Sequence, residues 1–204
     1  NHEDFRKLFS NFLYEIGYNK GETFWDRFVV RVAPAENNLP YREASRINIH
    51  RDTWGTNLYQ QINWWAPVSN VEEKNTMIFY PDYFDVPVKN TTSTWDLNIY
   101  LANRKKGDFS YPSAPQLKED LPSNIKKIPV TIKPGEILCF SGAHLHSSSK
   151  EKSENTRISF EIRTICENDL NSSAQAPNVD CDLQWKFPKI FKKINDNSPL
   201  KITS

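Results

Sequence analysis

The sequence predicts an all-β fold with peripheral helices. Short runs rich in β-branched and aromatic residues recur along most of the chain, and Pro, Asn and Gly separate them. The 13 prolines suit a loop-rich β domain and discourage long helices. A clear helical period appears at the start of the chain. Many short strands of this kind indicate a sandwich or a closed barrel.

The chain of 204 residues is long enough for one domain with a sizeable core, and we predict a single domain over 1–204. It divides into an N-terminal helix (1–17), a β-barrel core (28–165) and a C-terminal extension (166–204). The helix is indicated by one apolar stripe, formed by Phe5, Leu8, Phe9, Phe12, Leu13 and Ile16. The predicted strands are 28–32, 45–50, 58–65, 76–80, 97–101, 127–132, 136–140 and 157–165.

Two further segments have less regular patterns. The polar, proline-containing stretch 103–124 predicts a long excursion from the sheet, which serves either as a binding element or as a surface insertion. In the C-terminal extension, 187–194 has the pattern of a short amphipathic helix.

Composition excludes several classes of partner. The formal charge is +1, from 26 basic and 25 acidic residues, and no basic stripe points to nucleic acid. No apolar run is long enough to cross a bilayer. The three cysteines lack a paired spacing, which argues against a disulfide framework and favours a cytoplasmic location. We therefore expect a small-molecule substrate as the partner.

His50 and Asp52 are the first sign of a metal site. On a strand, residues two positions apart point to the same face, so this spacing presents an imidazole and a carboxylate to one point. A second imidazole is available downstream, at His144 or His146. Two histidines and one carboxylate hold non-haem Fe(II) on one face and leave the opposite positions open. Both ligand types are in their metal-binding protonation state near neutral pH.

A second block of the chain has a more specific pattern. A Pro-Gly-Glu turn at 134–136 precedes an apolar strand that ends at Phe140. A histidine, His146, follows Phe140 by six residues, and an arginine, Arg157, follows that histidine by eleven. The block resembles the phytanoyl-CoA hydroxylase-like branch of the Fe(II)- and 2-oxoglutarate-dependent oxygenases.

This resemblance implies a fold, a chemistry and a ligand set. The fold is a double-stranded β-helix, which is a jelly-roll or cupin-like barrel. The metal ligands and catalytic centre are His50, Asp52 and His146, with Fe(II) as the metal and 2-oxoglutarate as co-substrate. The implied activity is that of a dioxygenase, which uses dioxygen to hydroxylate a small-molecule metabolite and converts 2-oxoglutarate to succinate.

The resemblance also implies how the co-substrate is held. Arg157 pairs with its far carboxylate, and the hydroxyl of Ser148 or Ser159 assists. A guanidinium suits this role because it can bind a carboxylate through two parallel hydrogen bonds. Gln61 and Asn63 share one strand face after the metal motif, so they are candidates to hydrogen-bond the co-substrate or the metal ligands.

A narrower likeness is to a bacterial subgroup that includes a streptomycin-biosynthesis oxygenase-like protein. It rests on the segments 50–55, 61–67, 79–81 and 176–180. Halogenating relatives replace the metal-binding carboxylate with a small residue, so the presence of Asp52 argues against halogenase activity.

Two alternatives stay open. The first is a cupin-type metalloenzyme that uses His144 with His146 and needs no 2-oxoglutarate. The second is a non-catalytic barrel that binds a small ligand. Arg163 shares a strand face with Arg157 and Ser159, where it either binds an acidic group of the substrate or pairs with a neighbouring glutamate.

Overall fold

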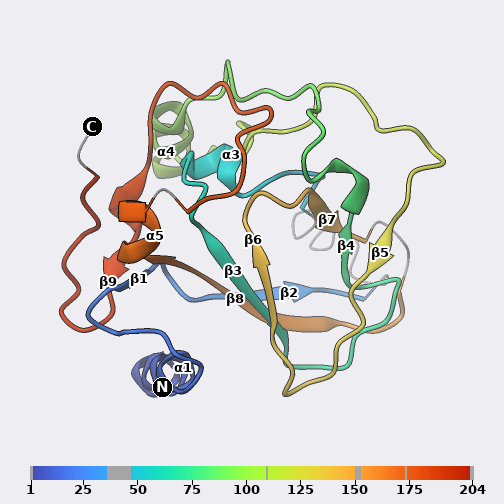
Figure 1. The fold of residues 1–204 in the computed structure, drawn as a ribbon. Coiled ribbons are helices and arrows are strands. Elements are labelled where there is room, and N and C mark those ends of the chain that lie inside the picture. The colour runs from blue at the N-terminus through green and yellow to red at the C-terminus, as the bar shows by residue number, and fades with distance from the viewer. Residues whose placement is uncertain (1, 36–46, 109, 150–152, 173, 203–204) are drawn as a thin grey trace.

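Two antiparallel sheets form the centre of the molecule (Figure 1). The computed structural model describes residues 2–35, 47–108, 110–149, 153–172 and 174–202. Every strand pair within these ranges is antiparallel. The predicted all-β character with few helices is therefore confirmed.

The larger sheet is organised around the long strand β8 (Arg157–Cys166). It has the order β6-β3-β8-β1-β9, and β2 also pairs with β8. The other strands are β1 (Thr23–Trp25), β2 (Val29–Ala33), β3 (Ile62–Pro67), β6 (Leu138–Ser141) and β9 (Lys192–Lys193). Because β9 joins this sheet, the C-terminal segment is part of the folded core structure. The predicted helix at 187–194 is wrong: this segment holds the 3-10 turn η3 (Pro188–Ile190) and then β9.

The smaller sheet has the order β5-β4-β7. Its strands are β4 (Met77–Phe79), β5 (Ile128–Pro129) and β7 (His146–Ser148). The predicted strand 45–50 lies partly outside the described residues. Within them, His50 forms an isolated antiparallel bridge with His146 of β7.

Alternation along β3 and β8 gives the larger sheet two different faces. Trp64 and Ile162 point outward, and helix α1 (His2–Glu15) covers them with Phe9 and Leu13, which are 3% and 0% exposed. Of the predicted apolar stripe, Leu8 and Ile16 remain exposed. On the opposite face Trp65 packs in a cluster with Met77 and Val130, which come from the smaller sheet and its flank. The two sheets thus share an apolar layer on that side.

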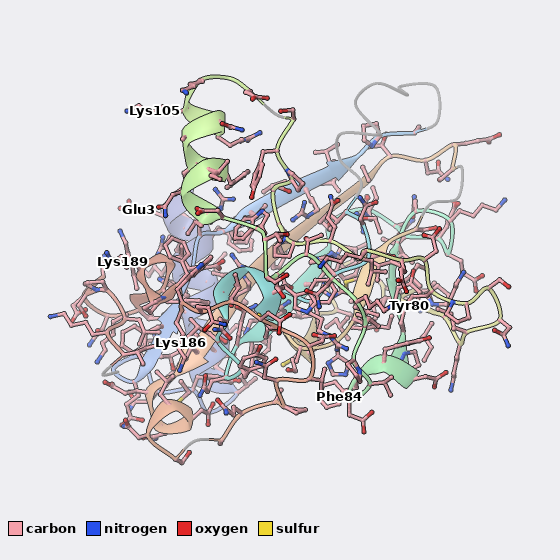
Figure 2. The ribbon with its side chains drawn as sticks, turned by 90° about the horizontal axis from the view of Figure 1, so that it is seen from above. Glu3, Tyr80, Phe84, Lys105, Lys186 and Lys189 are labelled. Carbon is pink, nitrogen blue, oxygen red and sulfur yellow. The ribbon has the colours of Figure 1, made fainter. Side chains whose placement is uncertain are left out.

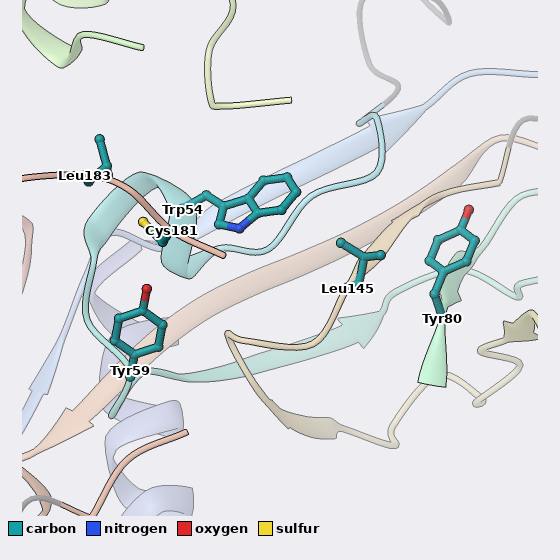
Figure 3. Close-up of a cluster of buried hydrophobic side chains, with 6 residues drawn as sticks. All are labelled: Trp54, Tyr59, Tyr80, Leu145, Cys181 and Leu183. Atoms are coloured by element: carbon teal, nitrogen blue, oxygen red, sulfur yellow. The ribbon is translucent and has the colours of Figure 1, made fainter. Parts of the chain in front are cut away.

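A further buried cluster lies under the loops at one end of the sheets (Figure 3). Trp54 of helix α3 (Thr53–Thr56) is fully buried and packs in this cluster with residues from both halves of the chain. Its other buried members are Tyr59, Tyr80, Leu145, Cys181 and Leu183. This packing fixes the position of α3, which begins directly after the candidate ligand Asp52.

One predicted strand is wrong. Residues 97–101 form the first part of helix α4 (Leu97–Lys105) rather than a strand. Asp96 precedes the helix, and its carboxylate accepts hydrogen bonds from the main-chain N–H groups of Asn98 and Ile99, at 2.6 and 3.2 Å. This N-cap satisfies two amide groups that a helix start leaves free, and so favours the helix. The remaining helical elements are α5 (Glu167–Ser172) and the 3-10 turn η2 (Pro81–Tyr83).

No helix in the described ranges combines the length and apolar character that crossing a bilayer requires.

Candidate metal centre

His50, Asp52 and His146 converge on one point. The Nε2 atom of His50 lies 3.7 Å from Oδ1 of Asp52, and the Nε2 atom of His146 lies 3.7 Å from Oδ2 of the same carboxylate. One ligand atom from each residue lies within 4.8 Å of the others. Both histidines are buried, and the Asp52 side chain is 22% exposed. Two imidazoles and a carboxylate at this spacing suit Fe(II).

Backbone pairing places the two histidines opposite each other. The amide N–H of His50 donates to the carbonyl of His146 at 2.9 Å, and the N–H of His146 donates back at 3.0 Å. Ser148 donates from its amide to the carbonyl of Ile47 at 3.0 Å, which extends the pairing. Residues that exchange both hydrogen bonds face each other across the strands. The imidazoles therefore sit side by side, with ring centroids 4.3 Å apart.

Each imidazole is oriented by the main chain. Nδ1 of His50 lies 2.8 Å from the carbonyl oxygen of Asn48, and Nδ1 of His146 lies 2.9 Å from that of His144. A carbonyl can only accept, so in the neutral ring Nδ1 carries the proton and donates. The Nε2 atoms then present lone pairs to the shared point, which is the arrangement that metal-ligating histidines use.

A chain of hydrogen-bonded polar side chains ends at the carboxylate of Asp52. The amide Nδ2 of Asn63 donates to Oδ2 of Asp52, and Gln61 in turn donates to Oδ1 of Asn63 at 2.9 Å. The hydroxyl of Thr56 donates to Oε1 of Gln61 at 3.1 Å. A Cβ atom at Gly142 would lie only 2.7 Å from Nε2 of Gln61, so this glycine leaves the space that these side chains occupy. Gln61 therefore orients Asn63, and Asn63 orients the carboxylate.

Arg163 contributes charge next to the carboxylate. Its Nη1 lies 4.0 Å from Oδ1 of Asp52, and its Nε donates to the buried Asp26 at 2.5 Å. The predicted pairing with a neighbouring glutamate is therefore replaced by a pairing with Asp26. Burial raises the pKa of Asp26, and the Arg163 charge opposes that effect.

The protonation states suit a cation. Burial, with the neighbouring His50 acting in the same direction and Asp52 opposing, lowers the pKa of His146 to about 4. Burial alone would raise the pKa of Asp52, but its interactions with His50, His146 and Arg163 outweigh that effect and hold this pKa below its usual range. At neutral pH the group therefore offers a neutral imidazole and an ionised carboxylate.

His144 lies apart from this group. Its ring stacks near Phe84, with centroids 4.5 Å apart, and its Nδ1 lies 3.2 Å from the carbonyl of Ser141. The metal-binding group found among the described residues contains His146 and not His144. The paired use of His144 and His146 has no support in this geometry.

A small interior cavity adjoins the metal position on the side of the larger sheet. Two spaces of about 40 and 30 Å³ share His50, His146, Arg31 and Glu161 in their linings. The second also reaches Ser148 and Arg157. Arg31 donates through Nε to Glu161 at 3.1 Å, so one ion pair crosses the lining.

Arg157 and Ser159 bring unmet hydrogen-bonding capacity to this region. Within the described residues, Nε of Arg157 and Oγ of Ser159 are buried and have no hydrogen-bond partner. Burial lowers the pKa of Arg157 to about 10, with the Arg31 charge acting in the same direction and Glu161 opposing. The guanidinium lies over the Trp65 ring at 5.6 Å. Buried polar atoms without partners are rare, and they fit a bound polar ligand. The residues present therefore fit a dicarboxylate such as 2-oxoglutarate.

The residues predicted for the co-substrate do not all reach this cavity. Arg157 and Ser148 line it, whereas Ser159 and Gln61 do not. The Ser148 hydroxyl accepts from the amide of Ile47 at 3.3 Å. Gln61 is fully buried behind Asn63.

Arg31 and Glu161 were missed by the sequence reasoning. Arg31 reaches the cavity because β2 pairs with β8, which sets Arg31 opposite Ser159. That pairing joins residues more than a hundred positions apart, and no local motif marks it. Glu161 could have been predicted from the sequence, because alternation along β8 places it on the same face as Arg157, Ser159 and Arg163.

No family model matches the chain, and no curated protein matches it. Among solved structures, EvdO2 from Micromonospora carbonacea var. aurantiaca is similar at 12% identity with a TM-score of 0.49, over 90% of this chain and 62% of that one. SnoK, a non-heme alpha-ketoglutarate-dependent carbocyclase from nogalamycin biosynthesis, is similar at 13% identity with a TM-score of 0.45, over 84% and 63%. The apo form of the non-heme monooxygenase ThoJ is similar at 14% identity with a TM-score of 0.47, over 72% and 47%.

The chain spans less than two thirds of the length of each of these structures. At this level of similarity the comparisons do not assign the chain to a family.

Proposed function

We propose that the protein is a non-haem Fe(II)- and 2-oxoglutarate-dependent oxygenase that acts on a small molecule. The observation that carries the proposal is the convergence of His50, Asp52 and His146 on one point. The ligand set binds one face of the metal and leaves the opposite positions for a co-substrate and dioxygen. Hydroxylation, with conversion of 2-oxoglutarate to succinate, is the reaction we propose.

The proposal includes the roles of the cavity residues. Arg157 binds the far carboxylate of 2-oxoglutarate, and the hydroxyl of Ser148, which lines the same cavity, assists it. The buried hydroxyl of Ser159, two residues after Arg157 on β8, is the second candidate for this role. Support comes from the Nε of Arg157, which has no hydrogen-bond partner in the part of the chain that the structure describes and can donate to an acidic ligand. Gln61 acts on the metal site through Asn63, because its side-chain hydrogen bonds among the described residues are with Thr56 and Asn63.

The fold and extent proposed with this function are a double-stranded β-helix made by a single oxygenase domain. Two antiparallel sheets that share an apolar layer support it, since Asp52 contacts Asn63 and Arg163 from the larger sheet and His146 from the smaller one. The site thus lies where the two sheets face each other.

Bound Fe(II), 2-oxoglutarate and dioxygen supply the oxidising power to remove hydrogen from an unactivated C–H bond. The chain supplies geometry. Asn63 holds the Asp52 carboxylate, and the carbonyls of Asn48 and His144 fix the imidazoles, so the ligands are oriented before the metal arrives. Trp65, Met77 and Phe140 line the interior cavity and limit the entry of water.

The interior cavity has room for only a few water molecules, so side chains of its lining would have to move for it to hold 2-oxoglutarate. The Arg31–Glu161 pair is the part of the lining that can do so. Its side chains are 30% and 32% exposed, whereas Arg157 is 2% exposed. An exposed ion pair is weak enough to break at little cost.

The test is an anaerobic titration with Fe(II), followed by 2-oxoglutarate. We expect one Fe(II) per chain and, on addition of 2-oxoglutarate, a weak visible charge-transfer band. Under air, succinate forms from 2-oxoglutarate. In His146→Gln the band and the succinate are lost, because one of three ligands is removed.

His144→Gln is the matched control, since it changes a half-buried histidine two positions away. It keeps the band. Loss of Fe(II) binding in both His144→Gln and His146→Gln would support the cupin-type alternative instead, because that alternative uses both histidines as ligands. Absence of the band in the unaltered protein, with folding intact, would contradict the oxygenase function and leave the two alternatives, the cupin-type metalloenzyme and the ligand-binding barrel.

A further inference from the structure

A second and larger cavity opens on the other side of the metal position. It has a volume of about 560 Å³, within the range of small-molecule sites, and His50, Asp52 and Arg163 form part of its floor. Helix α4, the residues around 113–114 and the segment 187–192 form its walls. Because His50 and Asp52 line both cavities, the metal position lies between this outer cleft and the interior cavity.

One wall of the outer cleft is aromatic. Trp95 and Tyr100 lie with their ring centroids 6.2 Å apart, and Phe187 faces the same space from the C-terminal segment. The indole N–H of Trp95 already donates to the carbonyl of Pro112 at 2.9 Å. The surface left to a ligand at this wall is therefore mainly apolar, and it suits a ring or a hydrocarbon body.

The charges of the outer cleft are strongly one-sided. Six basic residues line it, against the two acidic residues Asp26 and Asp52. Asp26 is engaged by Arg163, and Asp52 belongs to the metal centre. Of the basic residues, Arg51 is itself paired with Asp180 and is not available to a ligand. The chain as a whole carries a formal charge of only +1, so the excess of positive charge is local to this cleft.

Three of the basic residues are available to a ligand. Arg27, Lys189 and Lys192 are exposed, and within the described residues none of them forms an ion pair with an acidic side chain. They come from the turn between β1 and β2, from η3 and from β9, which are joined only by the fold. Figure 2 shows Lys189 on the same side of the molecule as α4.

We propose that the primary substrate is a small organic anion with an apolar or ring-shaped body, carrying a carboxylate or a phosphate. Arg27, Lys189 and Lys192 bind the anionic group, and the body packs on Trp95 and Phe187. This arrangement directs the far end of the molecule towards His50 and Asp52. The assignment as a substrate rests on the proposed oxygenase function, whereas the anion binding stands on the cleft alone.

The test measures binding of three probes to the full chain under anaerobic conditions with Fe(II) and 2-oxoglutarate. The probes are phenyl phosphate, phenylacetate and benzyl alcohol, which share a ring and differ in charge. We expect the two anions to bind, the alcohol to bind at least ten-fold more weakly, and added salt to weaken the anions alone. The preferred anion identifies the phosphate or the carboxylate class.

The variant Lys189→Glu/Lys192→Glu replaces two attractive charges with two repulsive ones. We expect about a ten-fold rise in the Kd of the preferred anion. The control Lys105→Glu/Lys118→Glu makes the same change in net charge at exposed lysines that do not line the cleft, and it leaves the Kd within about two-fold. Equal binding of benzyl alcohol and the anions, or equal Kd values in the two variants, would overturn the proposal.

The charge-transfer band separates this proposal from the oxygenase function. The Lys189→Glu/Lys192→Glu variant keeps the band, because neither lysine touches the metal ligands or the interior cavity. Anion binding without any band in the unaltered protein contradicts the oxygenase function and leaves an anion-binding cleft. A band without anion binding contradicts the substrate class alone.

Discussion

Arg51 and Arg157 are equally buried, at 2% exposure each, yet their surroundings differ completely. Arg51 stands between the metal ligands His50 and Asp52 in the sequence, but its side chain points away from them into a saturated set of acceptors. Arg157 lines the interior cavity and has a buried Nε without a partner among the described residues. Burial alone therefore does not tell a structural arginine from one that binds a ligand.

The acceptors around Arg51 tie distant loops together. The Nε of Arg51 donates to the carboxylate of Asp180 at 3.1 Å. The same carboxylate accepts hydrogen bonds from the indole N–H of Trp54 at 2.7 Å and from the main-chain N–H of Val88 at 3.1 Å. The other acceptors are the carbonyls of Tyr83, Phe84, Val86 and Ala143. A buried charge is tolerated when its hydrogen bonds are complete, so this centre serves the fold.

The surroundings of Arg157 leave capacity unused. Glu161, the acidic side chain whose charge acts on Arg157, is engaged by Arg31 on the neighbouring strand. The pKa of Arg157 is lowered to about 10 by burial, which shows that the charged form is poorly compensated. An anionic ligand would complete it. The difference between the two arginines thus separates a group that stabilises the loops from one poised for a co-substrate.

The largest effect is expected from Arg51→Met. Removing the guanidinium leaves Asp180 buried and uncompensated, which typically costs about 3–5 kcal/mol of unfolding free energy. Urea denaturation measures the loss. Lys118→Met removes an exposed cation, and its unfolding free energy stays within about 0.5 kcal/mol. A variant Arg51→Met as stable as the control would break the comparison.

Arg157→Met should behave in the opposite way. We expect the Kd of 2-oxoglutarate to rise about 100-fold, because the anchor for its far carboxylate is lost. The unfolding free energy stays within about 1 kcal/mol, since a poorly compensated buried charge is replaced by an apolar side chain of similar length. Calorimetric titration with 2-oxoglutarate in the presence of Fe(II) measures the first quantity.

Iron binding in Arg157→Met provides the internal control. Arg157 does not belong to the ligand group, so Fe(II) binds as in the unaltered protein. An unchanged Kd for 2-oxoglutarate would refute the role of Arg157 in binding it. A large loss of stability would show that Arg157, like Arg51, serves the fold.

Local patterns were enough to predict part of the fold and of the site. Short runs of β-branched and aromatic residues between Pro, Asn and Gly located β2, β3, β4 and β8 to within a few residues. The two-residue spacing of His50 and Asp52 and the register that selected His146 anticipated the group that the structure brings together. These signals are local, and each is carried by one short stretch of sequence.

The rest depends on pairing between distant segments. Arg31 enters the cavity through the register of β2 with β8, and Lys192 enters the outer cleft because β9 joins β1. Helix α4 was mistaken for a strand, since the alternation of Leu97, Ile99 and Leu101 outweighed the Asp96 cap in the sequence pattern. The exposure of Ile99 and Leu101, at 46% and 51%, shows that this alternation does not mark a buried face.

The smallest expected effect is the pH dependence of the unfolding free energy that the buried His146 causes. His146 has a folded pKa of about 4, below the usual 6.5, so between these values the unfolded chain binds more protons than the native one. Stability is therefore unaffected above pH 6.5 and falls as the pH drops towards 4. His144, whose pKa burial also lowers, acts in the same direction. Without metal, the unaltered protein should lose about 1–2 kcal/mol through His146 between pH 7 and pH 5.

His146→Gln removes this titration and should flatten the pH dependence by that amount, as urea denaturation at pH 7, 6 and 5 would measure. Excess metal should flatten it as well, because a cation bound to the native state favours the neutral imidazole at Nε2. A metal-free His146→Gln variant with the same slope as the unaltered protein would contradict the lowered pKa. The flattened slope would show that the metal centre reduces the stability of the metal-free fold at acidic pH, as expected of a site that binds a cation. The fully hydrogen-bonded centre at Arg51 and Asp180 differs from it in this respect.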